Sequence, residues 1–380
     1  MRIEKLLDRW RTAGIIDEAT SQRISDFEKR NSKPDGIFYV TGLGAISIAL
    51  GILALVASNW QGIPASLKIV ALFVMCALVS YFILRQKLKS APSVWVLDSL
   101  ILIYSGLVIA GIGLIGQVFQ MRGSVSSPLI AWAIAITPLV FFSVGYVVPL
   151  HWTLLVLATL TTGIMEYVQT YGRLAPFYVA ITAILLLPLA FIGVGKLQSL
   201  REKMPHFSKA FVGLGWVYLV ALGSLGQETW NYRGNGLYRA IESVYPALML
   251  TIAGLAIFFG FLKAFSIRLT WAQKILVLFC TMTPYLSLVF DFRSSLLGAL
   301  GFLFIWALIA KDAYDQQNRL LFKQATSVVG IRLFILYCQT LGGFLGTGVG
   351  LVASGVLLII GVKFWYSKSI ALTKAWGPKP

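Results

Sequence analysis

Four ionisable residues lie within or just inside long apolar stretches of this 380-residue chain: Lys68, Asp98, Glu166 and Arg332. A charge at the centre of a lipid bilayer costs on the order of 3 kcal/mol on insertion scales. Each of these residues therefore requires a partner, a wet cavity or a route to the membrane interface. Since intramembrane charges mark substrate pathways and proton relays, these positions are the first candidates for chemistry.

Depth along the apolar stretches suggests how these four charges pair. At 1.5 Å per residue, Asp98 and Arg332 both lie roughly 8 to 11 Å inside the same predicted face of the membrane. Lys68 and Glu166 both lie close to the opposite face. We therefore predict two interhelical ion pairs, Asp98 with Arg332 and Glu166 with Lys68. In the alternative, the two basic side chains extend to the interface and the two carboxyl groups are protonated or hydrogen-bonded there.

A second polar group of residues gathers at the predicted outer face. Arginine beside amide side chains can bind a phosphate or carboxylate. The alternative is a solvated interface in which Trp and Tyr act as anchors, as they do in many membrane proteins. This candidate outer polar vestibule consists of Asn59, Trp60, Lys68, Gln117, Gln120 and Arg122.

The sequence contains no recognisable catalytic constellation. There is no H-E-x-x-H, no phosphate-binding G-x-x-x-x-G-K-[ST] loop and no G-x-S-x-G. His151 and His206 are far apart, without Cys, Asp or Glu at ligand spacing, and the three cysteines all fall in apolar segments. We therefore expect no catalytic residues, no metal site and no cofactor.

Twelve apolar segments, most of them about twenty residues long, must position these candidates. A helix of about twenty residues crosses a hydrocarbon core about 30 Å thick. The tenth segment is short and the eleventh carries Arg332, so if either is re-entrant the count falls to eleven or ten. The predicted spans are 37–60, 65–84, 93–117, 128–150, 152–169, 176–195, 208–226, 245–263, 270–290, 294–310, 325–341 and 343–365.

Lysine and arginine crowd into the two terminal stretches and into every second gap between these spans, and these stretches together hold 25 of the 32 basic residues. Basic residues close to helix ends stay on the cytoplasmic side. The alternation therefore predicts an all-α polytopic transmembrane helix bundle of about 12 spans in a bacterial plasma (inner) membrane, with both termini cytoplasmic. Its parts are a cytoplasmic helical hairpin at 1–36, the bundle at 37–366 and a basic tail at 367–380.

The composition agrees with this class. Hydrophobic residues make up 58% of the chain and charged residues 12%, about half the charged fraction of a soluble domain. A net charge of +17 would suggest nucleic acid in a soluble protein, but here the basic gaps face anionic lipid headgroups. We expect membrane lipid as a partner and no nucleic acid.

The first 36 residues predict two short amphipathic helices. Leu6, Leu7 and Trp10 recur at helical spacing, Gly14 is a helix stop, and Asp17 is an N-cap for a second helix from about residue 18 to 30. Helices this short are marginal in water, so residues 1–32 must pack together, on the membrane or on a cytoplasmic protein partner. The candidate interaction face is Leu6, Trp10, Ile16 and Phe27.

Several motifs resemble a known family. They are LLDRWRTAGIIDEAT near the start, SNWQGIPASLK from Ser58 and GLIGQVFQMRGS from Gly113. These resemble the uncharacterised bacterial membrane proteins grouped as domain of unknown function 2157. The run RLFILYCQTLGGFLGTGVGLVASG is similar to the end of such proteins. The resemblance covers about the first 150 and the last 50 residues, and it implies a membrane topology but no activity. The matching positions include Trp10, Gly14, Asn59, Trp60, Lys68, Gly116, Gln117, Phe119, Gln120, Gly123, Arg332, Tyr337, Thr347, Gly348 and Gly350.

Three classes of function remain open. Many spans with short loops and intramembrane charges favour a transporter or flippase for a small anionic or lipid-linked molecule. The alternative is a non-enzymatic scaffold or sensor that acts through its N-terminal hairpin. A membrane-embedded transferase is the third class, disfavoured because no general base is apparent.

Overall fold

The computed structural model describes residues 3–31, 62–89, 93–121, 123–171, 174–227, 237–289 and 295–340, with Trp230 and single residues between 350 and 367. The chain divides into two compact units, residues 1–71 and residues 72–380. The secondary structure of the described residues is helical, and they contain no strand. The predicted all-α class is therefore confirmed.

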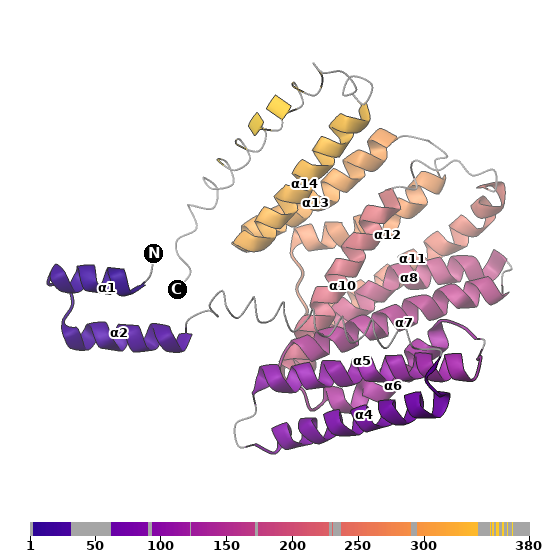
Figure 1. The fold of residues 1–380 in the computed structure, drawn as a ribbon. Helices are drawn as coiled ribbons and strands as arrows, with labels where there is room; N and C mark the ends of the chain where they lie inside the picture. Colours follow the sequence, from indigo (N-terminus) through magenta and orange to yellow (C-terminus); the bar gives the residue numbers. More distant parts are fainter. Residues whose placement is uncertain are drawn as a thin grey trace. The chain divides into compact units, whose positions relative to one another are not determined.

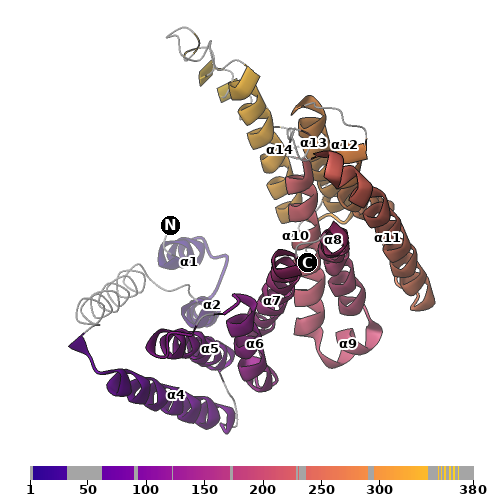
Figure 2. The ribbon, with the colours of Figure 1, turned by 90° about the vertical axis from the view of Figure 1, so that its right-hand side faces the viewer.

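The helices are drawn in Figure 1, and α9 is labelled in Figure 2. Their bounds are α1 Ile3–Thr12, α2 Glu18–Asn31, α4 Ala65–Lys87, α5 Val94–Val118, α6 Ser126–Val140, α7 Val147–Tyr171, α8 Leu174–Gly195, α9 Gln198–Lys203, α10 Pro205–Gly226, α11 Leu237–Ala264, α12 Trp271–Val289, α13 Ser295–Asp315 and α14 Arg319–Thr340.

In the first unit, α1 and α2 contact each other and are joined by a turn at Gly14. Gly14 has φ +66°, a conformation that glycine adopts without steric cost. Asp17 accepts a hydrogen bond from the backbone N–H of Thr20 at 3.0 Å, as an N-cap residue does. Hydrogen bonds from the Thr20 side chain and backbone hold the pKa of Asp17 below its usual value. Arg11 pairs with Glu18 at 2.8 Å across the turn.

The predicted interaction face of this unit is only partly described. Trp10 and Ile16 are half-buried, while the side chains of Leu6 and Phe27 lie outside the described set. Ile15, between the two helices, is 69% exposed. Binding of a partner by residues 1–32 stays a prediction.

Within the part of the chain that the structure describes, six helical stretches are long and apolar enough to cross a membrane. They are 65–87, 94–118, 147–170, 205–226, 244–264 and 296–315. Two further apolar helices, 126–140 and 179–195, are shorter. The protein is therefore a multi-pass membrane protein. Twelve spans stay a prediction, because the first predicted span and most of the last lie outside the described residues.

The boundary between the fourth and fifth predicted spans was wrong. The prediction extended one span to Leu150 and began the next at Trp152, whereas the turn lies at residues 141–146 and α7 begins at Val147. Phe141 and Phe142 keep the hydropathy high through this turn, so the sequence shows no polar gap there. His151 consequently lies inside α7 and not between two helices.

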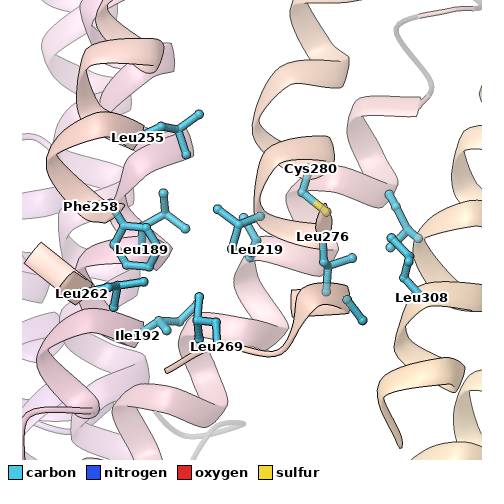
Figure 3. Close-up of a cluster of buried hydrophobic side chains, with 13 residues drawn as sticks. Leu189, Ile192, Leu219, Leu255, Phe258, Leu262, Leu269, Leu276, Cys280 and Leu308 are labelled. Atoms are coloured by element: carbon cyan, nitrogen blue, oxygen red, sulfur yellow. The ribbon is translucent and has the colours of Figure 1, made fainter. Parts of the chain in front are cut away.

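The largest apolar core joins α8, α10, α11, α12 and α13. In Figure 3, Leu219 of α10 lies between side chains of α11, such as Leu255, and those of α12, such as Leu276. Small residues allow close approach: a Cβ at Gly223 of α10 would lie 2.8 Å from the Cβ of Cys280. Membrane helices commonly pack through such small residues because dispersion contacts replace the hydrophobic effect there.

A polar cluster ties the start of α12 to the end of α13. Asp312 accepts hydrogen bonds from Thr270 Oγ1 at 2.6 Å, Gln273 Nε2 at 3.0 Å and Gln316 Nε2 at 2.6 Å. Lys196 lies just after α8. Burial lowers the pKa of its ammonium group, and the negative charge of Asp312 partly offsets this by favouring the protonated form. The carboxylate thus gathers three segments that are far apart in sequence.

We predict that Asp312→Ala lowers the free energy of unfolding by about 1–3 kcal/mol, because it leaves three donors without their charged acceptor. Reversible unfolding in bicelles measures the change. The matched control is Asp315→Ala on the same helix, where the carboxylate forms an exposed pair with Lys311. Exposed pairs contribute about 0–1 kcal/mol, so equal losses in the two variants would contradict the assigned role of Asp312.

Candidate functional site

Helices α5, α6 and α7 pack against one another, and each pair of the three is in contact. Figures 1 and 2 both show them side by side. Their apolar contacts include Leu97 and Ile101 of α5, Val140 of α6 and Val148 of α7. Polar side chains nevertheless lie inside this three-helix group. We call Asp98, Ser105, Trp132 and His151 the polar core of α5–α7.

Asp98, five residues into α5, is only 4% exposed. Its Oδ1 accepts a hydrogen bond from Ser143 Oγ at 2.9 Å and a longer one from the backbone N–H of Gly145 at 3.4 Å. Both donors belong to the turn between α6 and α7. Neither carries a charge, so neutral hydrogen bonds, and not an ion pair, satisfy this buried carboxyl group.

The turn that holds Asp98 requires a residue without a side chain. A Cβ at Gly145 would overlap the Asp98 carboxyl, at 2.9 Å from its Cγ, and would also lie 2.9 Å from Val94 Cγ1. Both contacts are closer than real Cβ atoms tolerate. Gly145 therefore lets the backbone of the turn approach α5 closely enough for its N–H to reach Asp98.

Seven residues further along α5, Ser105 connects all three helices. It is 1% exposed. Trp132 of α6 donates its indole N–H to Ser105 Oγ at 2.9 Å, and His151 Nε2 of α7 lies 2.9 Å from the same oxygen. The rings of Trp132 and His151 also contact each other, with centroids 5.6 Å apart. The result is a continuous hydrogen-bond chain from α6 through α5 to α7.

A second tryptophan contact lies beside this chain. Trp152 donates its indole N–H to Thr137 Oγ1 at 3.0 Å, and Thr137 in turn donates to the carbonyl of Ala133 at 2.6 Å. Trp152 also packs edge-on against Phe207 and Phe211 of α10. This pair joins α6 to α7 without involving Ser105 or His151.

Glu166, near the far end of α7, binds the start of α6. Its two carboxylate oxygens accept the backbone N–H of Ser126 at 3.1 Å each, and they also bond the N–H of Val125 and the hydroxyl of Ser126. The N-cap residue Val125 makes no side-chain cap. Since the first N–H groups of a helix lack partners and carry partial positive charge, Glu166 acts as the missing cap from a neighbouring helix.

The predicted ion pairs have different outcomes. Asp98 bonds to Ser143 and Gly145, while Arg332 of α14 lies over the ring of Phe302 of α13, 5.2 Å from its centroid. The pair Asp98–Arg332 is therefore not formed, and the alternative of a hydrogen-bonded carboxyl group fits Asp98. Lys68 belongs to the first unit and Glu166 to the second, so their pairing stays a prediction.

The outer polar vestibule is also untested as a whole. Gln117 and Gln120 are exposed at the end of α5, and Gln120 has φ 49° where the helix stops. Asn59, Trp60 and Arg122 lie outside the described residues. Among the residues that the structure describes, no group of three His, Cys, Asp or Glu side chains could hold a metal ion.

The comparisons with known proteins give one match. A family model, domain of unknown function 2157, described as a predicted membrane protein, matches residues 8–145. The resemblance is thus confirmed for this part of the chain, which includes Asp98, Ser105, Trp132 and Gly145, while His151 and the last 50 residues lie outside the match. No curated protein and no solved structure has a significant match to the chain.

The sequence analysis identified Asp98 but missed the other members of the polar core. Ser105 lies seven residues after Asp98, and therefore on the same face of α5, which is a usable signal. His151 was missed because it was placed between two spans. Its partners come from two other helices at sequence separations of 46 and 19 residues, which no local spacing reveals.

We predict that Gly145→Ala lowers the free energy of unfolding by about 1–3 kcal/mol, because the added methyl group displaces the Asp98 carboxyl and overpacks the turn. The control is Gly106→Ala on α5, where a Cβ meets nothing within 4 Å. Thermal unfolding in the same detergent measures both. A Gly145→Ala protein as stable as the Gly106→Ala protein would contradict the close approach of the turn to Asp98.

Proposed function

We propose that this protein is a transporter that moves a small anionic or lipid-linked molecule across the membrane. The observation that carries the proposal is Asp98, a carboxyl group 4% exposed on an apolar membrane helix and held by the uncharged residues Ser143 and Gly145. Polar and ionisable residues are expensive inside a membrane and, where they occur, mark substrate or ion pathways.

The neighbouring polar contacts support the proposal. At 1.5 Å per residue, Ser105 lies about 10 Å beyond Asp98 along α5. His151 of α7 and Trp132 of α6 both bond to Ser105, so polar groups of three helices meet about two turns along α5 from Asp98. The packing of α5, α6 and α7 does not require polar side chains at these positions, since Leu or Ala would pack there equally well.

The anionic class of the substrate rests on the sequence. Arg122 follows closely after the exposed amides Gln117 and Gln120, and arginine beside amides suits a phosphate or carboxylate. Both a free anion and a lipid headgroup carry this chemistry. The test therefore needs one assay for each source.

The first assay records currents on solid-supported membranes from proteoliposomes given small carboxylates and inorganic phosphate. The second follows dithionite bleaching of fluorescently labelled phosphatidylglycerol to detect lipid flipping. We predict activity in one of them that is lost in Asp98→Asn, which keeps oxygen and size but removes the charge. Asp315→Asn on the surface of α13 is the control and should keep wild-type activity. Folded protein without activity in either assay would contradict transport.

The second candidate is a scaffold or sensor acting through residues 1–32. It is favoured by Ile15, which is 69% exposed between α1 and α2 and so offers an apolar contact to a cytoplasmic protein partner or to membrane lipid. A protein of this kind would be inactive in both assays, whether or not Asp98 is intact.

A further inference from the structure

We infer that His151 is a proton-binding site, in which Ser105 changes from hydrogen-bond donor to acceptor as the imidazole gains a proton. The inference deepens the proposed function and rests on it in one respect: the proton would be the ion coupled to transport. The binding of the proton itself stands on the geometry of Ser105, Trp132 and His151 alone.

Trp132 determines which groups donate and which accept in this series of hydrogen bonds. An indole N–H can only donate, so Ser105 Oγ, at 2.9 Å, is the acceptor of that bond. A serine hydroxyl has one proton to donate and two lone pairs. One lone pair is thus used by Trp132, which leaves one proton and one lone pair of Ser105 for the contact with His151 at 2.9 Å.

In the neutral state, the hydroxyl of Ser105 donates to His151 Nε2. The imidazole then carries its hydrogen on Nδ1, because the nitrogen that accepts a hydrogen bond is the unprotonated one. The opposite tautomer, with hydrogen on Nε2, would force the Ser105 hydroxyl to donate elsewhere. The carbonyl of Ile101, four residues earlier, is the acceptor that a helical serine can reach, but Ser105 makes no bond to it in the structure, whereas Thr153 and Thr159 of α7 do bond the carbonyls four residues before them. The hydrogen bonds of Ser105 therefore favour the His151 tautomer with hydrogen on Nδ1.

Proton uptake needs only a rotation of the hydroxyl. A proton added at Nε2 makes that nitrogen a donor to the second lone pair of Ser105 Oγ, and the hydroxyl hydrogen rotates away from the imidazole. One proton is bound, one N–H bond is formed, and the bond from Trp132 to Ser105 persists in both states. Proton binding and release therefore reverse the direction of the bond between Ser105 and His151, and the positive charge of the imidazolium strengthens that bond in the protonated state.

The surrounding charges bear on both states of His151. Helices α5, α6, α8 and α10 pack against α7, and α6 contains no titratable residue. The titratable residues of α5, α8 and α10 are Asp98, Tyr104, Tyr178, His206, Lys209 and Tyr218, and α7 itself adds Glu166, Tyr167 and Tyr171.

The chain has only two histidines, which makes a direct test possible. In the full-length His206→Gln protein, labelled with ¹⁵N-histidine in lipid nanodiscs, His151 gives the only imidazole signals. Nitrogen chemical shifts report the tautomer and the protonation state directly. We predict an unprotonated Nε2 at neutral pH and protonation of both ring nitrogens as the pH falls from about 9 to 4, the range that brackets ordinary histidine titration.

Two variants give a matched comparison. Ser105→Ala removes the hydroxyl that donates to His151 Nε2, so the preference for hydrogen on Nδ1 should be lost and the Nε2–H tautomer should increase. Trp152→Phe removes an indole bond of similar length on the adjacent residue of α7, which goes to Thr137, and should leave the tautomer unchanged. Equal spectra of the two variants, a wild-type ring with hydrogen on Nε2, or no titration would each overturn the inference.

The link to transport is tested separately. A pH gradient imposed on the same proteoliposomes should drive wild-type flux, and His151→Gln should abolish that dependence. Flux that depends on Asp98 but not on the pH gradient would overturn the coupling role while the proposed transport stands. A titrating His151 in a protein without flux would instead contradict the proposed function and leave the proton site intact.

Discussion

Polar groups inside a membrane-spanning bundle must find their partners within the protein, because the hydrocarbon around them offers none. This constraint explains the arrangement of α5, α6 and α7. Asp98 is satisfied by the turn after α6, Ser105 by tryptophan and histidine from two other helices, and the start of α6 by Glu166. Each contact crosses between helices. The hydrogen bonds that make these polar residues tolerable therefore also fix how the three helices pack.

The remaining helices of the second unit are held together more by close packing than by polar contacts. Between α10 and α13, a Cβ at Gly301 would lie 2.8 Å from Cδ of Gln227, which is itself 1% exposed. Between α8 and α10, a Cβ at Gly215 would lie 2.8 Å from Ile192 Cγ1. Glycines here allow backbones to approach, and leucine, phenylalanine and cysteine fill the space between them. Polar contacts also occur there, between the neutral hydroxyl groups of Thr251 and Tyr285 at 2.8 Å and around the Asp312 carboxylate at one end of α13.

The sequence predicted the parts of the fold that depend on local composition. Apolar stretches of about twenty residues located the membrane helices, while Gly14 and Asp17 marked the turn and the cap between α1 and α2. It failed at residues 141–146, where two phenylalanines conceal a turn that Ser143 and Gly145 make. That error also concealed the site, because His151 becomes an intramembrane residue only when α7 begins at Val147. Equal depth in the membrane is likewise a weak basis for predicting ion pairs. It led to the predicted pair of Asp98 and Arg332, whereas Arg332 of α14 lies over the ring of Phe302 of α13.

The central claim is that Ser105 and Trp132 bond to each other inside the bundle and thereby hold α5 against α6. A double-mutant cycle of Ser105→Ala and Trp132→Phe, measured by reversible unfolding in bicelles, tests it most directly. The account predicts a coupling energy of roughly 0.6–1.7 kcal/mol, the range found for hydrogen bonds between membrane helices. Strictly additive effects of the two substitutions would contradict it, because side chains that do not interact show no coupling.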